Sequence, residues 1–296
     1  MFTKDQVKIN NLISGTTKVY GIIGNPVTFS LSPMIQNTLS SFLEIDSIYL
    51  PFPVEDGRLS NAIRGGHALN IQGFNVTHPY KQDVMGHLTY IDPLAKQIGA
   101  VNTLKYEGKG YSGYNTDADG LYTSLKQNNI SLEDKEIIVL GAGGAARATL
   151  MMAAKYGARS IYILNRTLDK ADLLAIEVKK YYNINVEVLP LDEWHKLPGD
   201  CICFQTTSVG MGKSKDKAPI DHDDFYKKIS VAIDLIYNPF ETLFLKKAKR
   251  QGSYTINGLG MLLYQAIKAY EIWNNIELTD SQLRQIEDTI ERNIPI

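Results

Sequence analysis

Short apolar runs alternate along this chain with longer segments whose apolar residues recur at helical spacing. Such alternation is typical of α/β layers built on parallel sheets. In the first part of the chain it predicts strands, the last two forming a hairpin, at Val19–Ile23, Ile48–Phe52, Gly73–Val76, Val101–Tyr106 and Tyr111–Tyr114. It also predicts helices at Pro33–Leu43, with Ser32 as the N-cap residue, and at Ala118–Gln127.

The second part of the chain repeats the alternation more regularly. Strands are predicted at 137–140, 160–164, 186–189, 201–205, 231–235 and 254–256, with helices at 145–156 and 168–181. An apolar helix over 261–273 follows, and a last helix begins at a capping box formed by Thr279 and Gln282. We therefore expect two α/β domains with helices at the C-terminus.

A glycine turn joins the first strand and the first helix of this second part. Its candidate pyrophosphate contacts are Gly141, Gly143, Gly144 and Ala145. Glycines here let the backbone approach a pyrophosphate closely, and the N–H groups at the helix start point toward it. The pattern indicates a Rossmann-type, dinucleotide-binding domain over residues 117–257.

The next strand of this domain ends in Asn165 and Arg166, followed by Thr167. An NAD-selective site usually has Asp or Glu at this position, where the carboxylate binds the ribose hydroxyls. A guanidinium instead suits the 2′-phosphate of NADP. The sequence therefore favours NADP(H) as the cofactor.

Bulk composition narrows the range of partners. The 296 residues are 44% hydrophobic and carry a net charge of −1. A charge so close to zero favours neither nucleic acid nor an anionic membrane as the main binding partner. No segment holds the roughly 18 uninterrupted apolar residues of a membrane helix. Lys4, Asp5, Gln6 and Lys8 stand where a signal peptide would be apolar, so we expect no export.

The cysteines predict that the protein works in a reducing compartment, and the histidines predict that it has no metal centre. Cys201 and Cys203 lie two apart in a predicted strand and are expected to be buried, reduced thiols, which favours the cytoplasm. The histidines show no metal-ligand spacing, so we expect no metal site. We interpret the acidic residues around His222 as a solvated loop.

Polar residues follow strands of the first part at three places. Ser30 and Ser32 flank a helix start, where two hydroxyls and the helix dipole suit a small carboxylate. Lys81 is expected in the first turn of a helix, where a cation opposes the dipole, although a solvated surface lysine is the commoner case. Asp117 and Asp119 open the helix after the hairpin, where one N-cap would explain them.

The order of these motifs carries more information than any one of them. Before the glycine turn stand Ser30-x-Ser32-Pro33, Asn75-Val76-Thr77-x-Pro79-x-Lys81, Ala100-Val101-Asn102-Thr103 and Asn115-Thr116-Asp117-x-x-Gly120. After it stand Asp234-x-x-Tyr237-Asn238-Pro239-x-x-Thr242 and Asn257-Gly258-x-x-Met261-Leu262-x-x-Gln265. From about Val19 to Gln265, this series resembles the shikimate dehydrogenase family.

That family reduces 3-dehydroshikimate to shikimate with NADPH, in the route to aromatic amino acids. The resemblance implies that Lys81 and Asp117 form the catalytic pair. It assigns the substrate carboxylate to Ser30, Ser32 and Tyr237, and the ring hydroxyls to Thr77, Asn102, Asp117 and Gln265. It places the adenosine 2′-phosphate by Asn165, Arg166, Thr167 and Lys170, and the nicotinamide by Gly258 and Met261. Residues 1–116 and 258–296 would form the substrate-binding domain, to which the C-terminal helices return.

Several positions depart from the family pattern. Gln205 stands where the family has Asn, and its extra methylene could shift the loop near the nicotinamide. His78 and Tyr80 replace the commoner residues beside Lys81, and Phe29 stands where a His is frequent. The changes at 205, 78 and 80 could alter rate or substrate range.

Three alternatives stay open at this point. A quinate/shikimate dehydrogenase uses the same scaffold for a wider substrate and cofactor range. A methylene-tetrahydrofolate dehydrogenase also pairs a lysine with a Rossmann domain, but it leaves the serine and Asn-Thr-Asp motifs unexplained. A non-catalytic, NADP-binding regulatory protein belongs to a different class, and the presence of both Lys81 and Asp117 argues against it. The sequence does not distinguish a monomer from a homodimer.

Overall fold

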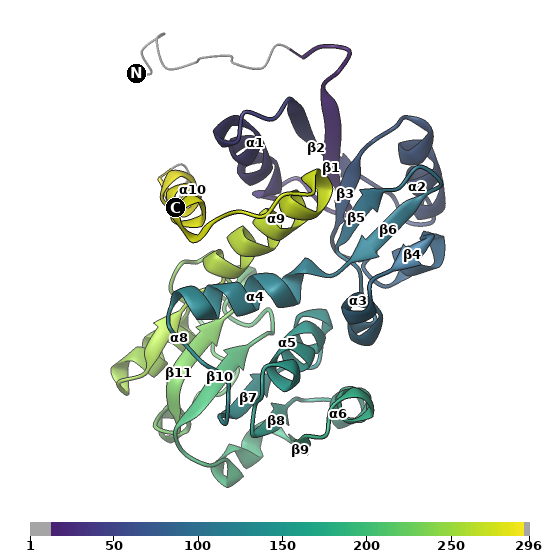
Figure 1. The fold of residues 1–296 in the computed structure, drawn as a ribbon. Helices are drawn as coiled ribbons and strands as arrows, with labels where there is room; N and C mark the ends of the chain where they lie inside the picture. The colour runs from purple at the N-terminus through teal and green to yellow at the C-terminus, as the bar shows by residue number, and fades with distance from the viewer. Residues whose placement is uncertain (1–12, 293–296) are drawn as a thin grey trace. The chain divides into compact units, whose positions relative to one another are not determined.

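The computed structural model describes residues 13–292, so the polar positions Lys4 to Lys8 lie outside the described residues. The chain divides into two compact units (Figure 1). The first unit contains the described residues up to Thr116 and those from Ala266 onward, and the second contains Asp117–Gln265. The expected pair of α/β domains is confirmed. The exact bounds of the substrate-binding domain (1–116 and 258–296) and of the NADP-binding domain (117–257) stay predictions.

The first unit is built on a sheet with strand order β2-β1-β3-β5-β6-β4. Its strands are β1 (Lys18–Gly24), β2 (Ser47–Pro53), β3 (Gly73–Val76), β4 (Tyr90–Ile91), β5 (Thr103–Tyr106) and β6 (Tyr111–Tyr114). β1 runs parallel to β2 and β3, whereas β5 is antiparallel to both β3 and β6. The expectation of a parallel sheet is wrong for this unit, because the correctly predicted hairpin pairs directly with β3 and reverses the strand direction.

Helices of the first unit include two that the apolar pattern did not predict, α2 and α3. The set comprises α1 (Ser32–Phe42), α2 (Leu59–Ala68), the 3-10 helix η1 (Asp83–His87), α3 (Pro93–Ile98), the last part of α9 (Leu259–Asn274) and α10 (Asp280–Glu291). α9 packs on both α1 and the sheet, since Gln36 Nε2 donates to the Ala266 carbonyl at 3.0 Å and Trp273 Nε1 donates to the Leu104 carbonyl at 2.8 Å. α10 begins at the predicted capping box of Thr279 and Gln282.

The second unit has an entirely parallel sheet of order β12-β11-β10-β7-β8-β9. Its strands are β7 (Glu136–Leu140), β8 (Ser160–Leu164), β9 (Asn185–Leu189), β10 (Cys201–Gln205), β11 (Ile229–Asp234) and β12 (Tyr254–Ile256). Its helices are α4 (Thr116–Gln127), α5 (Gly144–Lys155), α6 (Leu168–Tyr181), η2 (Leu191–Lys196), η3 (Gly212–Ser214), α7 (Asp223–Tyr226), α8 (Leu243–Arg250) and the first part of α9. This order reverses between β7 and β10, the point where open α/β sheets bind ligands.

The core of the second unit lies around β10, all of whose residues are buried. Cys201 and Cys203 are free thiols in this strand, as predicted. Burial raises the pKa of the Cys201 thiol from 9.0 to about 12 and raises that of Cys203 well above its usual value. Both sulfurs therefore stay protonated and unreactive.

Two properties of the described residues bear on function. No helix within residues 13–292 is both long and apolar enough to cross a membrane. Within the same range, no group of three or more His, Cys, Asp or Glu side chains is arranged to hold a metal ion. Around His222, the carboxylates of Asp221 and Asp223 instead pair with Lys247, and that of Asp224 pairs with Lys227.

Candidate active site

The glycine turn after β7 has the conformation that a phosphate-binding loop requires. Gly141 has a φ of +113°, and a Cβ atom there would lie 2.8 Å from both Thr206 Oγ1 and Thr207 Cγ2. Positive φ and this close contact both exclude a side chain. Gly141 is therefore fixed by two independent constraints, and the loop after β10 lies directly against it.

The start of α5 offers the anion seat predicted from the sequence. A Cβ atom on Gly143 or Gly144 would meet nothing within 4 Å, so the space beside this backbone is open. Gly143 is the N-cap, and the first N–H groups of the helix, among them those of Gly144 and Ala145, have no acceptor inside the helix. Open space, oriented donors and the helix dipole together fit a pyrophosphate.

The end of β8 presents basic side chains to solvent. Asn165 Nδ2 donates to the Thr167 carbonyl at 2.8 Å, which shapes the turn into α6. Arg166 and Lys170 are exposed, and neither forms an ion pair with another described residue. An exposed guanidinium beside the glycine-turn strand fits a phosphate monoester such as the 2′-phosphate of NADP.

Buried polar groups join the ends of β10 and β11. Gln205 Nε2 donates to the Val209 carbonyl at 2.9 Å, and Gln205 Oε1 accepts from the Thr207 N–H at 2.7 Å. Asp234 accepts from Thr242 Oγ1 at 2.6 Å and from the Ile236 N–H at 3.0 Å. Burial nevertheless raises the pKa of the Asp234 carboxyl from 3.8 to about 6. The sequence pointed to Gln205 as a departure near the nicotinamide loop and to Asp234 as part of a family motif, but it did not predict the hydrogen bond between them.

The remaining site candidates of the second unit lie after β11 and in α9. Gly258 donates its N–H to the Ile236 carbonyl at 3.0 Å, and a Cβ atom there would collide with the carbonyl of Leu235. Met261 is half-buried on the first turn of α9. Gln265 is 9% exposed, and its Nε2 donates to the Leu262 carbonyl at 2.8 Å. Tyr237 is half-buried, which raises the pKa of its phenol.

In the first unit, the two serines lie at the start of α1 in different roles. Ser32 is not the N-cap: the helix includes it, and Leu31 occupies the cap position without a side-chain hydrogen bond. Ser30 Oγ instead accepts from the Ser32 N–H at 3.2 Å. Ser32 is buried and its side chain interacts with the phenol of Tyr49, so tertiary packing competes with the capping interaction.

A polar network continues from Tyr49 across the sheet. Tyr49 Oη donates to Asn75 Oδ1 at 2.8 Å, and Asn75 Nδ2 donates to Thr103 Oγ1 at 3.1 Å. Asn102 Oδ1 then accepts from the Thr116 N–H at 2.8 Å, at the beginning of α4. Every member is buried, so each hydrogen bond fixes a side chain in a low-dielectric setting.

Lys81 does not lie in the first turn of a helix, contrary to the sequence-based expectation. It belongs to a hydrogen-bonded turn between β3 and η1, which begins at Asp83, so no helix dipole opposes it. Its carbonyl accepts from the Val101 N–H at 2.8 Å, and the side chain is half-buried. The turn is anchored by Tyr80, whose Oη donates to the Val54 carbonyl at 2.7 Å.

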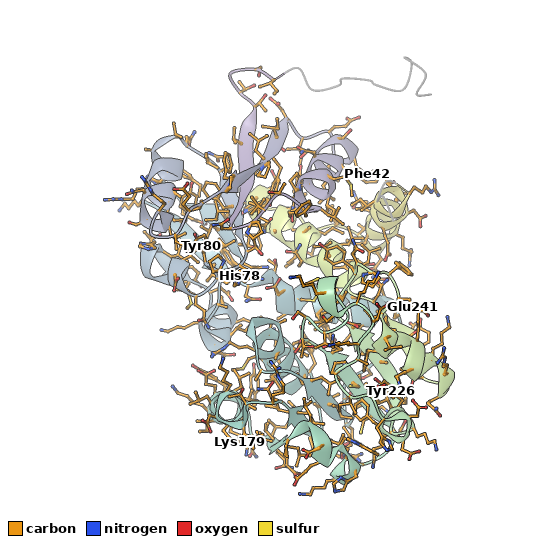
Figure 2. The ribbon with its side chains drawn as sticks, turned by 180° about the vertical axis from the view of Figure 1, so that it is seen from behind. Phe42, His78, Tyr80, Lys179, Tyr226 and Glu241 are labelled. Atoms are coloured by element: carbon orange, nitrogen blue, oxygen red, sulfur yellow. The ribbon has the colours of Figure 1, made fainter. Side chains whose placement is uncertain are left out.

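The two unusual residues of this turn therefore differ in environment. Tyr80 is buried, and burial followed by the hydrogen bond to Asp56 raises the pKa of its phenol. His78, labelled with Tyr80 in Figure 2, is exposed. The substitution at position 80 thus acts as an anchor for the backbone that carries Lys81.

One edge of the first sheet collects the predicted substrate-binding residues of that unit. Thr77 follows β3, and its N–H donates to the Ile23 carbonyl of β1 at 2.9 Å. Because β5 is antiparallel to β3, Asn102 at its start reaches the same edge, where its carbonyl accepts from the Val76 N–H at 2.8 Å. Ser30 and Ser32 follow the end of β1, and Lys81 follows the end of β3, which runs parallel to β1. Asp117, half-buried in the first turn of α4, opens the second unit.

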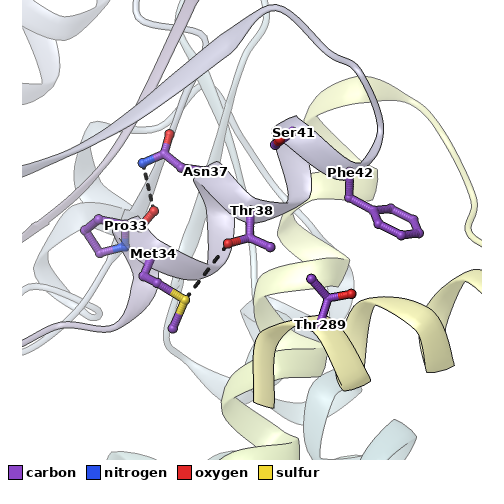
Figure 3. A pocket seen from close by; sticks show the side chains of 7 residues that line it. All are labelled: Pro33, Met34, Asn37, Thr38, Ser41, Phe42 and Thr289. Atoms are coloured by element: carbon purple, nitrogen blue, oxygen red, sulfur yellow. Dashed lines mark hydrogen bonds between the residues drawn. The ribbon is translucent and has the colours of Figure 1, made fainter. Parts of the chain in front are cut away.

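A groove of about 700 Å³ lies elsewhere in the first unit, along α1. Figure 3 shows its lining, in which α10 contributes Thr289 and α1 contributes Pro33, Met34, Asn37, Thr38, Ser41 and Phe42. Asn37 and Thr38 direct their polar groups to the Pro33 carbonyl and to the Met34 sulfur. None of the predicted site residues lines it, so size alone does not locate the chemistry.

Comparison with known proteins connects this geometry to a family. The family model for the shikimate dehydrogenase substrate binding domain matches residues 22–104, and the model described as shikimate / quinate 5-dehydrogenase matches residues 124–208. The shikimate dehydrogenase (NADP(+)) of Caldanaerobacter subterraneus subsp. tengcongensis is 42% identical over 261 residues, which are 88% of this chain and 93% of that protein.

Solved structures agree over nearly the whole chain. A shikimate dehydrogenase crystallised in complex with NADP+ has a TM-score of 0.85 and 39% identity, covering 95% of this chain and 98% of its own. The shikimate 5-dehydrogenase of Listeria monocytogenes, in complex with shikimate and NAD, has a TM-score of 0.88 and 30% identity, covering 96% and 99%. This chain therefore belongs to the shikimate dehydrogenase family.

Proposed function

We propose that this protein reduces 3-dehydroshikimate to shikimate with NADPH, in the route to aromatic amino acids. One observation carries the proposal most directly. Ser30, Thr77, Lys81 and Asn102 lie in the segments at one edge of the first sheet, and their hydroxyl, ammonium and amide groups suit a small polyhydroxy carboxylate. The family relationship gives the same activity.

The residues proposed to bind NADP(H) all lie in the second unit. Gly141, Gly143, Gly144 and Ala145 would hold the pyrophosphate, and Asn165, Arg166, Thr167 and Lys170 the 2′-phosphate. Gly258 and Met261 would contact the nicotinamide. When bound, NADPH supplies the hydride that reduces the substrate carbonyl. The exposed Arg166, which has no acidic partner among the described residues, supports NADP(H) over NAD(H).

In this proposal Lys81 is the catalytic acid and Asp117 its partner. A lysine ammonium can stabilise the negative charge that develops on the carbonyl oxygen and can donate a proton to it. Ser30, Ser32 and Tyr237 would orient the substrate carboxylate, and Thr77, Asn102 and Gln265 its hydroxyls. The hydrogen bond from Val101 to the Lys81 carbonyl, together with the Tyr80 anchor, supports a fixed position for the lysine.

The test follows NADPH absorbance with purified protein and 3-dehydroshikimate, then repeats it with 3-dehydroquinate and with NADH. Rapid oxidation with the first substrate and NADPH alone is the expected outcome. Turnover of dehydroquinate, or of NADH at a similar rate, would move the protein to the broader quinate/shikimate class. Binding of NADPH without any oxidation would instead favour the regulatory protein.

The cysteines bear on the cellular location of the protein, and the proposed site residues bear on its assembly. Two free thiols held in a buried strand support a reducing compartment, and we infer the cytoplasm. The active site proposed above needs residues of one chain only, so either a monomer or a homodimer would suffice. Light scattering on the purified protein distinguishes the two.

A further inference from the structure

Gln205 is the hub of the loop that follows β10. Its side chain is fully buried, and its amide binds the loop backbone on both sides. Oε1 accepts from the Thr207 N–H at 2.7 Å and from Thr207 Oγ1 at 2.8 Å. Nε2 donates to the Val209 carbonyl at 2.9 Å and to the Thr207 carbonyl at 3.2 Å. One side chain thus replaces the ladder partners that the strand loses where it ends.

The same loop forms a wall against the glycine turn. Thr206 Oγ1 donates to the Leu140 carbonyl at 2.7 Å, which ties the loop to the last residue of β7. Thr206 and Thr207 are also the residues that a Cβ atom on Gly141 would meet. The position of this wall therefore determines how much room remains beside the backbone proposed to hold the pyrophosphate.

Asp234 and Thr242 hold the Gln205 side chain and the end of the loop in place. Asp234 Oδ1 accepts from Gln205 Nε2 at 3.4 Å, and the other oxygen of Asp234 accepts from Thr242 Oγ1 at 2.6 Å. Thr242 also lies against Gly210, where an added Cβ would be 3.3 Å from its side chain. The loop from Thr206 to Gly210 is consequently held at its start, its middle and its end.

We propose that Gln205 is a positioning residue for the cofactor, which sets the wall formed by Thr206 and Thr207 over Gly141 and so determines the affinity for NADP(H). This inference rests on the proposed function. Length matters as well as the amide, because an amide one methylene shorter at this position would have to reach the carbonyls of Thr207 and Val209 and the carboxylate of Asp234 from farther away.

The test compares four variants with the wild type. Gln205→Met keeps the length and loses the amide, and Gln205→Asn keeps the amide and loses the length. Thr207→Val is a milder change that removes one hydroxyl from the network and keeps the shape facing Gly141. Ser208→Ala alters an exposed hydroxyl of the same loop and serves as the matched control. Fluorescence titration gives the Kd for NADPH, calorimetry the Kd for shikimate, and thermal melting reports folding.

We expect the Kd for NADPH to rise about tenfold or more in both Gln205 variants and about threefold in Thr207→Val, because each leaves buried polar groups without partners. The Kd for shikimate should stay within about twofold, as should both constants of Ser208→Ala. In steady-state assays the KM for NADPH should rise more than kcat falls.

Three outcomes would overturn the inference. An unchanged Kd for NADPH in Thr207→Val and in a folded Gln205 variant would remove the positioning role. An equal loss of both ligands with a lowered melting temperature would show a purely structural role. A wild-type protein that does not bind NADPH would overturn the proposed function together with this inference, and that result is visible before any variant is made.

Discussion

Lys81 is the residue whose replacement tests the chemistry most directly. We expect Lys81→Ala to lower kcat by about 10²- to 10⁴-fold, the usual contribution of a general acid. The Kd for NADPH should change by less than about twofold, because the proposed cofactor contacts come from other residues. Lys109→Ala, which removes an exposed ammonium from the turn between β5 and β6, is the matched control. A regulatory protein would lose neither property, and a collapse of NADPH binding would contradict the assignment of Lys81.

Arg166 is the residue proposed to make the protein select NADPH over NADH. Removing a guanidinium that pairs with a phosphate usually costs about 1.5–3 kcal/mol, which is about 10- to 100-fold in affinity. We therefore expect Arg166→Ala to raise the Kd for NADPH by that factor and to leave the Kd for NADH almost unchanged. Equal weakening of both cofactors would place Arg166 outside the 2′-phosphate site. Arg159→Ala, on the same unit but paired with Asp134, provides the comparison.

Residue patterns predicted the local backbone conformation well where one residue has one dominant constraint. Gly141 illustrates this, because its positive φ and its contact with Thr206 both demand glycine. Ser32 illustrates the opposite case. A serine before a proline is a strong local signal for an N-cap, but Ser32 lies inside the helix and its buried side chain interacts with Tyr49 of β2 instead. A partner that distant in sequence leaves no trace in local spacing.

At the scale of elements, apolar periodicity located the strands better than the short helices. The segments now seen as β5 and β6 were predicted as a hairpin, and they form one. η1 is a 3-10 helix whose start at Asp83 leaves Lys81 in the preceding turn. Such a short helix has too few turns to show helical spacing. The mixed direction of the first sheet also escaped prediction, because strand direction depends on which strands become neighbours rather than on their sequences.

The capping box of α10 offers a quantitative test at this scale. Thr279 Oγ1 accepts from the Gln282 N–H at 3.3 Å, and Gln282 Oε1 accepts from the Thr279 N–H at 3.0 Å. Thr279→Ala should therefore lower the free energy of unfolding by about 1 kcal/mol. Urea denaturation measures this change. Ser281→Ala, at an exposed position of the same helix, should have almost no effect, and equal changes in both variants would argue against the cap.

At the scale of the whole molecule, the fold says more about the position of the proposed active site than the groove does. The alternation of strand and helix patterns in both parts of the chain predicted two α/β units, and the structure confirms them. The groove along α1 is large, but none of the predicted site residues is among its lining residues. Carboxyl ends of parallel strands, rather than hollow volume, locate the proposed chemistry. The hub of Gln205 and Asp234 could not be predicted, since it depends on the register between β10 and β11.

Stability of the whole protein should depend on pH through Asp234. Its pKa is raised from 3.8 to about 6, because burial outweighs the hydrogen bonds from Thr242, Ile236 and Gln205. The folded protein therefore holds this proton more tightly than the unfolded chain does. The resulting stabilisation is complete below pH 3.8 and is lost as the pH rises through about 6. The ionised carboxylate at neutral pH is less favourable by roughly 3 kcal/mol.

Asp234→Asn isolates this contribution, because an amide does not titrate. We expect the free energy of unfolding of the wild type, minus that of the variant, to fall by roughly 2.5 kcal/mol between pH 4 and pH 8. Urea denaturation at a series of pH values measures both curves. Asp172→Asn removes the same charge at an exposed position of α6, and its difference from the wild type should stay nearly constant. A constant difference for Asp234→Asn as well would mean that its carboxyl keeps an ordinary pKa, and that burial at the end of β11 is compensated by its hydrogen bonds.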